Sequence, residues 1–217
     1  MKIEYFGHSC FRLTNAEGTS VVTDPYTKVG YELPKGLTAD VITVSHCHFD
    51  HNYIVGVEGA KAVVQSEGRT SVQGVSIVGA ETWHDPKQGA LRGNNLIFII
   101  ELDGIKVCHC GDLGEPFCEK VARILKGADI WLIPIGGTYT IDAKQAKEYI
   151  EKLQPKCVIP MHYLPNDGRL DIASAETFLN LFQEKEISYC LQGEMELSME
   201  DIHSGKTKII YMERKGV

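Results

Sequence analysis

The feature that most constrains this chain is a cluster of metal-capable side chains, His46-Cys47-His48-Phe49-Asp50-His51, directly after the apolar residues 41–45. The apolar run is rich in β-branched residues and too short for a helix, so it predicts a buried strand that ends where the cluster begins. Because His46 and His48 are two residues apart, both imidazoles project to one side of an extended chain and can share a metal ion. Asp50 and His51 follow where the chain must turn, so they can face a second ion about 3.5–4 Å away. In an α/β arrangement, the carboxyl ends of strands are where such sites are built.

The H-x-H-x-D-H spacing resembles the signature of the metallo-β-lactamase superfamily, whose members fold as an αββα sandwich and mostly catalyse metal-assisted hydrolysis. The opening Gly7-His8-Ser9-Cys10-Phe11 resembles the branch that contains ascorbate-6-phosphate lactonase and small uncharacterised hydrolases. The resemblance implies an α/β fold, a four-layer αββα sandwich, in one domain over residues 1–217. Two stretches share the order strand, glycine-containing turn, strand and aspartate, which predicts two similar halves.

The resemblance also implies ligands downstream of the cluster. His84, Asp112 and His162 each follow a strand-like run, in the order that the superfamily requires. Taken alone, His84 would be a surface or core histidine and Asp112 a turn residue. The implied arrangement has His46, His48 and His84 around one metal ion, Asp50, His51 and His162 around the second, and Asp112 between them.

Several residues near these ligands have open roles. His8, Asp24 and Tyr163 are candidates for contacts with substrate or with the ligands, and Asp24 and Asp85 can accept hydrogen bonds from ligand imidazoles. His109 lies inside a predicted strand, so a packing or supporting role is favoured. The Gly136-Gly137 pair can let backbone N–H groups approach an anion, or it is an ordinary loop.

The predicted chemistry follows from the donor set. Imidazole and carboxylate ligands favour two divalent ions, with Zn²⁺ preferred and Mn²⁺ or Fe²⁺ as alternatives. Two such ions would lower the pKa of a bridging water, and the resulting hydroxide would attack a carbonyl carbon or a phosphorus. Asp50 and Asp112 are the catalytic candidates. The leaving group can take its proton from metal-bound water, Asp50, His8 or Tyr163. The expected substrate is a small anionic ester, lactone or phosphodiester.

Composition narrows the class of protein. A chain of 217 residues with 43% hydrophobic and 24% charged residues is typical of a globular domain. Its net charge of −7 argues against a nucleic-acid partner. No apolar run approaches the roughly 20 residues that span a membrane, and the start has no signal-peptide pattern. Seven scattered cysteines indicate reduced thiols. We therefore expect a cytoplasmic protein with a small-molecule substrate, and the sequence is compatible with a homo-oligomer.

Two alternatives to this hydrolase remain. An RNA or DNA phosphodiesterase of the same fold would need basic side chains around the site, and the loop candidates are Lys28, Lys35, Arg69, Lys87, Arg92 and Arg169. On an acidic protein these cations fit a solvated surface better. An iron-binding redox or sensing module belongs to a different class, but the chain has no room for an accompanying flavin domain. A metal-binding protein without catalysis is the least attractive interpretation, because the ligand set is complete.

Patterns elsewhere predict the remaining elements. Asp103-Gly104 between two apolar runs indicates a hairpin. Amphipathic spacing predicts helices over residues 115–126, 143–153 and 172–186. Residues 187–197 and 206–212 are expected to add edge strands.

Overall fold

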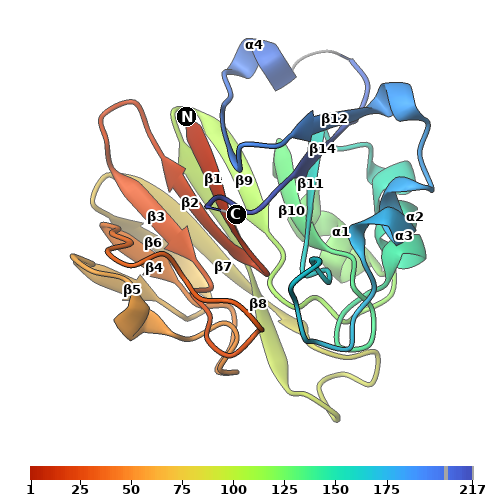
Figure 1. The fold of residues 1–217 in the computed structure, drawn as a ribbon, viewed down its shortest axis with the longest axis horizontal. Coiled ribbons are helices and arrows are strands. Elements are labelled where there is room, and N and C mark those ends of the chain that lie inside the picture. Colours follow the sequence, from red (N-terminus) through yellow and green to blue (C-terminus); the bar gives the residue numbers. More distant parts are fainter. Residues whose placement is uncertain (203–204, 217) are drawn as a thin grey trace.

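The computed structural model describes residues 1–202 and 205–216, and in this part of the chain the strands form two mixed β-sheets packed face to face (Figure 1). The six-stranded sheet has the order β13-β1-β2-β3-β4-β5, with β1 (Lys2–Gly7), β2 (Cys10–Thr14), β3 (Ser20–Thr23), β4 (Val41–Thr43), β5 (Ala62–Val64) and β13 (Glu194–Glu196). The eight-stranded sheet has the order β12-β14-β11-β10-β9-β8-β7-β6, with β6 (Gly68–Val72), β7 (Val75–Trp83), β8 (Asn94–Leu102), β9 (Ile105–His109), β10 (Ile130–Pro134), β11 (Cys157–Met161), β12 (Ile187–Cys190) and β14 (Lys208–Met212).

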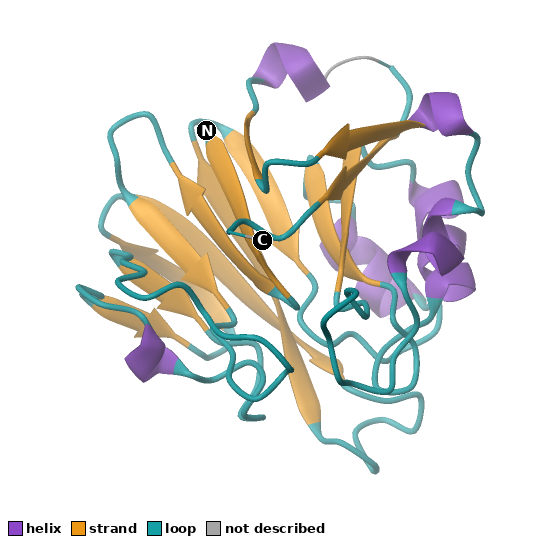
Figure 2. Cartoon of the chain, in the orientation of Figure 1, coloured by secondary structure: helices purple, strands orange, loops and turns teal. Residues whose placement is uncertain are grey.

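The helices are short, and the first three along the chain gather on one side of the molecule, beside β10 and β11 (Figure 2). They are α1 (Glu119–Leu125), α2 (Ala143–Leu153), α3 (Ala175–Leu179) and α4 (Met199–Ile202), with single 3₁₀ turns η1 (Ile54–Gly56) and η2 (Glu184–Glu186). Asp142 begins α2 with a capping box, in which its side chain accepts from Gln145 N and the Gln145 side chain accepts from Asp142 N. This confirms the predicted helix 143–153.

One large apolar core joins the two sheets and the helices. Ile3, Phe11 and Leu13 of the six-stranded sheet share this core with Ile97 and Val107 of the eight-stranded sheet, and all five side chains are fully buried. A second, smaller apolar cluster lies where the loop after β3 packs on the six-stranded sheet, with Tyr26 and Val29 against Val22 and Ile42. The architecture is the expected α/β sandwich.

Strand direction brings the carboxyl ends of many strands to one edge of each sheet. In the six-stranded sheet β3, β4 and β5 are parallel, and β1 shares their direction because it pairs antiparallel with β2, which is antiparallel to β3. In the other sheet β9, β10, β11, β14 and β12 are parallel, and β7 shares their direction through β8. Segments that leave these strands can therefore converge on one site.

The structure confirms some predicted elements and corrects others. Asp103 and Gly104 have φ of 52° and 76° between β8 and β9, the conformation of a two-residue type I′ hairpin turn. The strand at 208–212 was expected at an edge, but β14 lies between β11 and β12. Its consecutive buried residues Ile209 and Ile210 fit an interior parallel strand, which needs apolar side chains on both faces.

Two helices are shorter in the structure than the ranges predicted from the sequence. The first begins at Glu119 rather than residue 115, because Glu115 accepts a hydrogen bond from Trp83 N and the preceding loop is held to β7. The helix expected over 172–186 divides into α3 and η2. After Leu179 the backbone makes tighter i to i+3 bonds, Leu181 N to Phe178 O and Phe182 N to Leu179 O, which end the α-helix.

Candidate metal centre

The candidate site is built from segments that follow the carboxyl ends of six strands. His8 follows β1, Asp24 follows β3, the cluster at residues 46–51 follows β4, His84 follows β7, Asp112 follows β9 and His162 follows β11. His8, Asp24 and His162 have positive φ values of 52°, 37° and 52°. Such a conformation is uncommon for residues other than glycine, and it turns each chain sharply at the site.

The structure brings six of the seven predicted ligands together in two groups, and the seventh, Asp112, lies with His46 and His51. His46, His48 and His84 form one group, and Asp50, His51 and His162 lie in the other together with His8. Within each group one donor atom of every residue lies within 4.8 Å of the others. We call these the first and second groups. The second group is mostly buried, whereas His46 and His48 of the first group are partly accessible to solvent.

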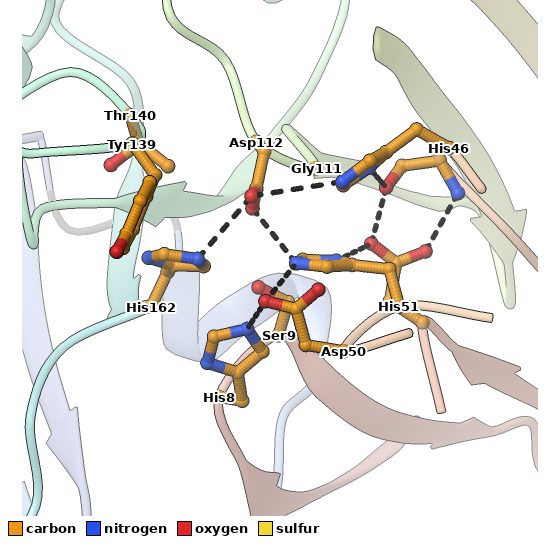
Figure 3. Close-up of polar contacts among 12 residues, drawn as sticks. His8, Ser9, His46, Asp50, His51, Gly111, Asp112, Tyr139, Thr140 and His162 are labelled. Atoms are coloured by element: carbon orange, nitrogen blue, oxygen red, sulfur yellow. Dashed lines mark hydrogen bonds and ion pairs between the residues drawn. The ribbon is translucent and has the colours of Figure 1, made fainter. Parts of the chain in front are cut away.

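Asp112 lies between the two groups (Figure 3). Its Oδ2 is 3.2 Å from His84 Nε2 and 3.8 Å from His46 Nε2 on one side, and 3.3 Å from His162 Nε2 on the other. Its Oδ1 is 3.1 Å from His51 Nε2. One buried carboxylate therefore faces imidazoles of both groups, which is the placement expected of a bridging ligand.

The donor atoms at the centre fit metal ions. Among the described residues, several buried atoms that face one another have no hydrogen-bond partner, namely His8 Nε2, His46 Nε2, His51 Nε2, Asp112 Oδ1, and both ring nitrogens of His162. A buried polar atom without a partner is costly. The atoms are nitrogens and carboxylate oxygens, which are common zinc ligands. Divalent ions in the two groups would supply the missing partners.

Other side chains hold the imidazoles in an orientation suited to metal binding. Asp24 Oδ2 is 2.7 Å from His51 Nδ1, and it also accepts a hydrogen bond of 2.5 Å from Ser45 Oγ. Since that Ser45 hydroxyl donates to Asp24, it accepts from His46 Nδ1 at 2.9 Å. His84 Nδ1 donates to the Tyr139 carbonyl at 3.1 Å. Each of these three imidazoles is held through Nδ1, so its Nε2 is left to face the site.

Charges in the site suit cation binding. Burial, and then the nearby His51, lower the pKa of His46 well below its usual value. Burial and His162 lower the pKa of His8 to about 4. Both imidazoles are therefore neutral near pH 7, the form that binds metals. Burial alone would raise the pKa of Asp112, but His162 and His51 outweigh it and hold that pKa well below the ordinary range.

His109 is a structural residue at the edge of the site, as the sequence favoured. Its Nε2 donates to the Ser9 carbonyl at 2.8 Å, and its Nδ1 accepts from Gly111 N at 3.2 Å. Both ring nitrogens are thus satisfied by backbone. His109 ties the turn that carries His8 to the loop that carries Asp112, so it links the two sheets next to the metal ligands.

The contacts of Asp85, Tyr163 and Gly136 show how each of them is used in the structure. Asp85 holds the loop after His84, since its two oxygens accept from the backbone N–H groups of Lys87, Gly89, Leu91 and Arg92. Tyr163 is buried, and its hydroxyl is engaged because it donates to Met212 O at 2.9 Å. In the Gly136-Gly137 loop, a Cβ on Gly136 would lie 2.2 Å from His162 O, which explains that glycine by close backbone approach.

Ser45 and Tyr139 are contributors that sequence reasoning missed. Ser45 directly precedes His46, and its hydroxyl gave only a weak signal beside three histidines. Tyr139 acts through its main-chain carbonyl. Every residue has such a carbonyl, so the identity of residue 139 does not reveal this role. A cavity of about 410 Å³ opens beside the first group, lined by His46, His48, Arg92, Glu67 and Glu81 among others.

Comparisons with known proteins identify the family of the chain. Residues 2–162 match the family described as "Beta-lactamase superfamily domain". A UPF0173 metal-dependent hydrolase of Thermococcus onnurineus is 30% identical over 213 residues, covering 85% of this chain and 93% of the relative. A solved structure from Thermotoga maritima, classed as a Zn-dependent hydrolase of the metallo-beta-lactamase superfamily, is 35% identical with a TM-score of 0.76, covering 98% of this chain and 99% of that one. Igni18, a metallo hydrolase of Ignicoccus hospitalis, shares the fold at 23% identity with a TM-score of 0.66, covering 99% and 95%.

The chain therefore belongs to the metallo-beta-lactamase superfamily and is a metal-dependent hydrolase. The resemblance found in the H-x-H-x-D-H cluster and the α/β sandwich expected from it are confirmed. In the part of the chain that the structure describes, no helix is long and apolar enough to cross a membrane.

Proposed function

We propose that the chain binds two divalent metal ions, preferably Zn²⁺, and hydrolyses a small anionic ester, lactone or phosphodiester. The observation that carries the proposal is the convergence of unpartnered, buried donor atoms in two groups that share Asp112. His46, His48 and His84 would hold one ion, and Asp50, His51 and His162 the other. When bound, a pair of divalent ions lowers the pKa of a water molecule towards neutrality and polarises the oxygen of the electrophile.

The residues of the chain prepare this chemistry in three ways. Asp112 faces both groups and so fixes their separation. Asp24, Ser45 and the Tyr139 carbonyl orient three imidazoles before a substrate arrives. The buried second group forms the floor of the site, so the substrate approaches from the more accessible side of His46 and His48.

The preference for an anionic substrate is supported by Arg92. Its guanidinium lines the cavity beside His46 and His48, where it donates to the Thr138 carbonyl at 2.9 Å and lies over the Tyr139 ring. These two contacts hold the guanidinium in place beside the first group. The cavity also has the carboxylates of Glu67 and Glu81, and Glu81 is already engaged by Asn94. Arg92 is thus the cation at this cavity that can pair with a carboxylate or phosphate.

The proposal is tested first by metal content. Plasma mass spectrometry on native protein never exposed to chelator should find about two metal ions per chain, and His84→Ala and Asp112→Asn should each lose metal. Asp40→Asn is the matched control, because Asp40 binds Ser20 and Lys61 outside the site. Lactones and phosphodiesters are then screened with the identified metal restored. One ion or none in the native protein would contradict the two-metal proposal.

A further inference from the structure

We infer that His8 is a fourth protein ligand of the second metal ion, in addition to Asp50, His51 and His162, and that it binds through Nε2. The inference rests on the proposed function, since it requires an ion in the second group. His8 lies outside the H-x-H-x-D-H cluster, and at least 42 residues of sequence separate it from every other member of its group. Its donor atom nevertheless lies within 4.8 Å of theirs.

The backbone holds His8 in a fixed position. Its carbonyl accepts from His162 N at 2.8 Å and from the Tyr5 hydroxyl at 3.1 Å. The next carbonyl, of Ser9, accepts from His109 Nε2 at 2.8 Å. The residue itself is 1% exposed and has a φ of 52°. The His8 carbonyl is bound by the N–H of His162, and the backbone of His8 has an uncommon conformation. These constraints hold the buried imidazole towards the site before an ion binds.

The distances around His8 Nε2 fit two ligands of one ion better than a hydrogen bond. His8 Nε2 is 3.3 Å from Asp50 Oδ2, and Nε2 has no hydrogen-bond partner among the described residues. Two ligand atoms at about 2.0–2.1 Å from a five-coordinate zinc ion lie roughly 2.9–3.6 Å apart, at angles of about 90–120°. Direct N–H···O bonds have a donor–acceptor distance of about 2.7–3.2 Å. Figure 3 shows His8 and His51 on either side of Asp50, each directing a nitrogen towards its carboxylate.

The neighbouring rings also point to a shared ion. The His8 ring centroid lies 4.2 Å from that of His162 and 4.9 Å from that of His51. All three imidazoles are buried, and the Nε2 atom of each has no hydrogen-bond partner among the described residues. An apolar core would not place three histidines in this way, because each unpaired nitrogen costs free energy. A cation with Asp50 as a charged ligand removes that cost for all three.

This ligand makes the two positions unequal. The second would have four protein ligands besides Asp112, and the first would have three. The first position is also the one beside the cavity and the partly exposed His48. The free coordination site for substrate should therefore belong to the first position, while the second serves mainly to hold its ion firmly.

The direct test is a crystal structure of the native protein loaded with zinc. The expected result is a distance of about 2.0–2.1 Å between His8 Nε2 and the second zinc ion. A second zinc ion bound by Asp50, His51 and His162, with His8 Nε2 well beyond that distance, would overturn the inference. A zinc-loaded native protein without a second ion would instead contradict the proposed function, so the two failures are distinguishable.

Cobalt titration provides a second test in solution. Chelator-treated native protein, His8→Gln and His8→Asn are titrated with Co²⁺, and the visible spectrum reports the ligands of each equivalent. Asn tolerates positive φ, so His8→Asn keeps the backbone conformation and provides a test in the event that His8→Gln does not fold. We expect the second equivalent to bind at least tenfold more weakly in both variants and to show an altered spectrum. Unchanged affinity, or weaker binding with an unchanged spectrum, would overturn ligation by His8.

Asp40→Asn is the control, because Asp40 binds Ser20 and Lys61 outside both groups. It should bind both Co²⁺ equivalents with the native spectrum. Loss of the second equivalent in this control as well would show that the His8 variants lose it through the fold rather than through ligation, and would count against the inference.

Discussion

Asp24 and His51 form a fully buried contact, with 2.7 Å between Oδ2 of the carboxylate and Nδ1 of the imidazole. The same oxygen accepts from Ser45 Oγ, which in turn holds His46 Nδ1. One carboxylate therefore orients an imidazole of each metal group. Burial alone would raise the pKa of Asp24, but His109 and His51 outweigh burial and lower it, so the carboxylate stays ionised.

The first prediction concerns this carboxylate. Asp24→Asn keeps the size of the side chain but removes the charge that fixes His51 and Ser45. Outer hydrogen-bond partners of metal ligands typically contribute 10- to 100-fold in metal affinity. We expect a loss of that order for zinc, measured by competition with a chromophoric chelator. Asp40→Asn is the control, and equal zinc affinity in both variants would contradict the positioning role of Asp24.

Much of the candidate site was predictable because its residues follow strands in a fixed order. His46, His48, Asp50 and His51 are close in sequence, so local geometry alone brings them together. His84, Asp112 and His162 needed the family resemblance, which supplied their order along the chain. The placement of His8 with the second group was harder to foresee, since it depends on how β1 lies against β11 through the bond from His162 N to His8 O.

Other features could not be predicted because they depend on tertiary packing. Tyr163 follows His162 directly, yet its side chain packs against Tyr5 and Tyr211 instead of facing the site. The interior position of β14 depends on a parallel pairing with β11, about 50 residues earlier in the chain. Helical periodicity over 172–186 was overridden by a turn after Leu179. In each case the local pattern was real, and contacts distant in sequence decided the outcome.

The second prediction concerns the close approach at Gly136. A Cβ there would lie 2.2 Å from His162 O, and a backbone oxygen cannot move aside without displacing His162. We expect Gly136→Ala to lower the free energy of unfolding by about 1–3 kcal/mol, measured by urea denaturation. It should also weaken the second metal equivalent, because His162 belongs to that group.

Gly127→Ala is the control for this substitution. The nearest atom to a Cβ on Gly127 is Ile124 O at 3.5 Å, an ordinary contact. It should change the unfolding free energy by less than about 0.5 kcal/mol and leave both metal equivalents in place. If Gly136→Ala matched this control in stability and metal binding, the close approach would have no role in placing His162.

The third prediction concerns pH and Glu4, which lies on β1 away from the metal groups. Arg12 pairs with both oxygens of the Glu4 carboxylate, at 2.6 Å and 2.9 Å, and Lys215 contacts it as well. Burial raises the pKa of Glu4, but Arg12 and Lys215 outweigh burial and lower it from 4.5 to about 2. Because the folded pKa lies below the unfolded one, the charged carboxylate stabilises the fold above pH 4.5, and this contribution is lost as the pH falls through about 2.

Glu4→Gln should therefore reduce the unfolding free energy at pH 7 by the order of 1 kcal/mol, allowing for solvent screening of the partners. The gap between native protein and variant should narrow as the pH falls from 4.5 towards 2. Chemical denaturation of chelator-treated proteins at several pH values removes the contribution of the metals. Glu17→Gln, in an exposed turn, is the control. A gap that stays constant over this pH range would show that the Glu4 ion pairs do not stabilise the fold.

The fourth prediction concerns Arg92 at the cavity. A hydrogen bond to a charged group is worth about 1.5–3 kcal/mol, so Arg92→Gln should raise KM for an anionic substrate roughly ten- to hundredfold with a smaller effect on kcat. Bis-p-nitrophenyl phosphate is the anionic probe, and p-nitrophenyl acetate is the neutral one. KM for the neutral ester should stay near its native value.

Arg69→Gln is the matched control for Arg92→Gln, since Arg69 lies on β6 and donates to Ser76 Oγ outside the site. It removes the same charge from the protein without touching the cavity, so it separates a local contact from a change in overall charge. Varying the ionic strength separates a direct contact with the substrate from a long-range effect of charge. The effect of Arg92→Gln on KM should persist at high ionic strength, because a contact pair is screened less than a distant field. An equal rise in KM for both probes, or for both arginine variants, would remove Arg92 from substrate recognition.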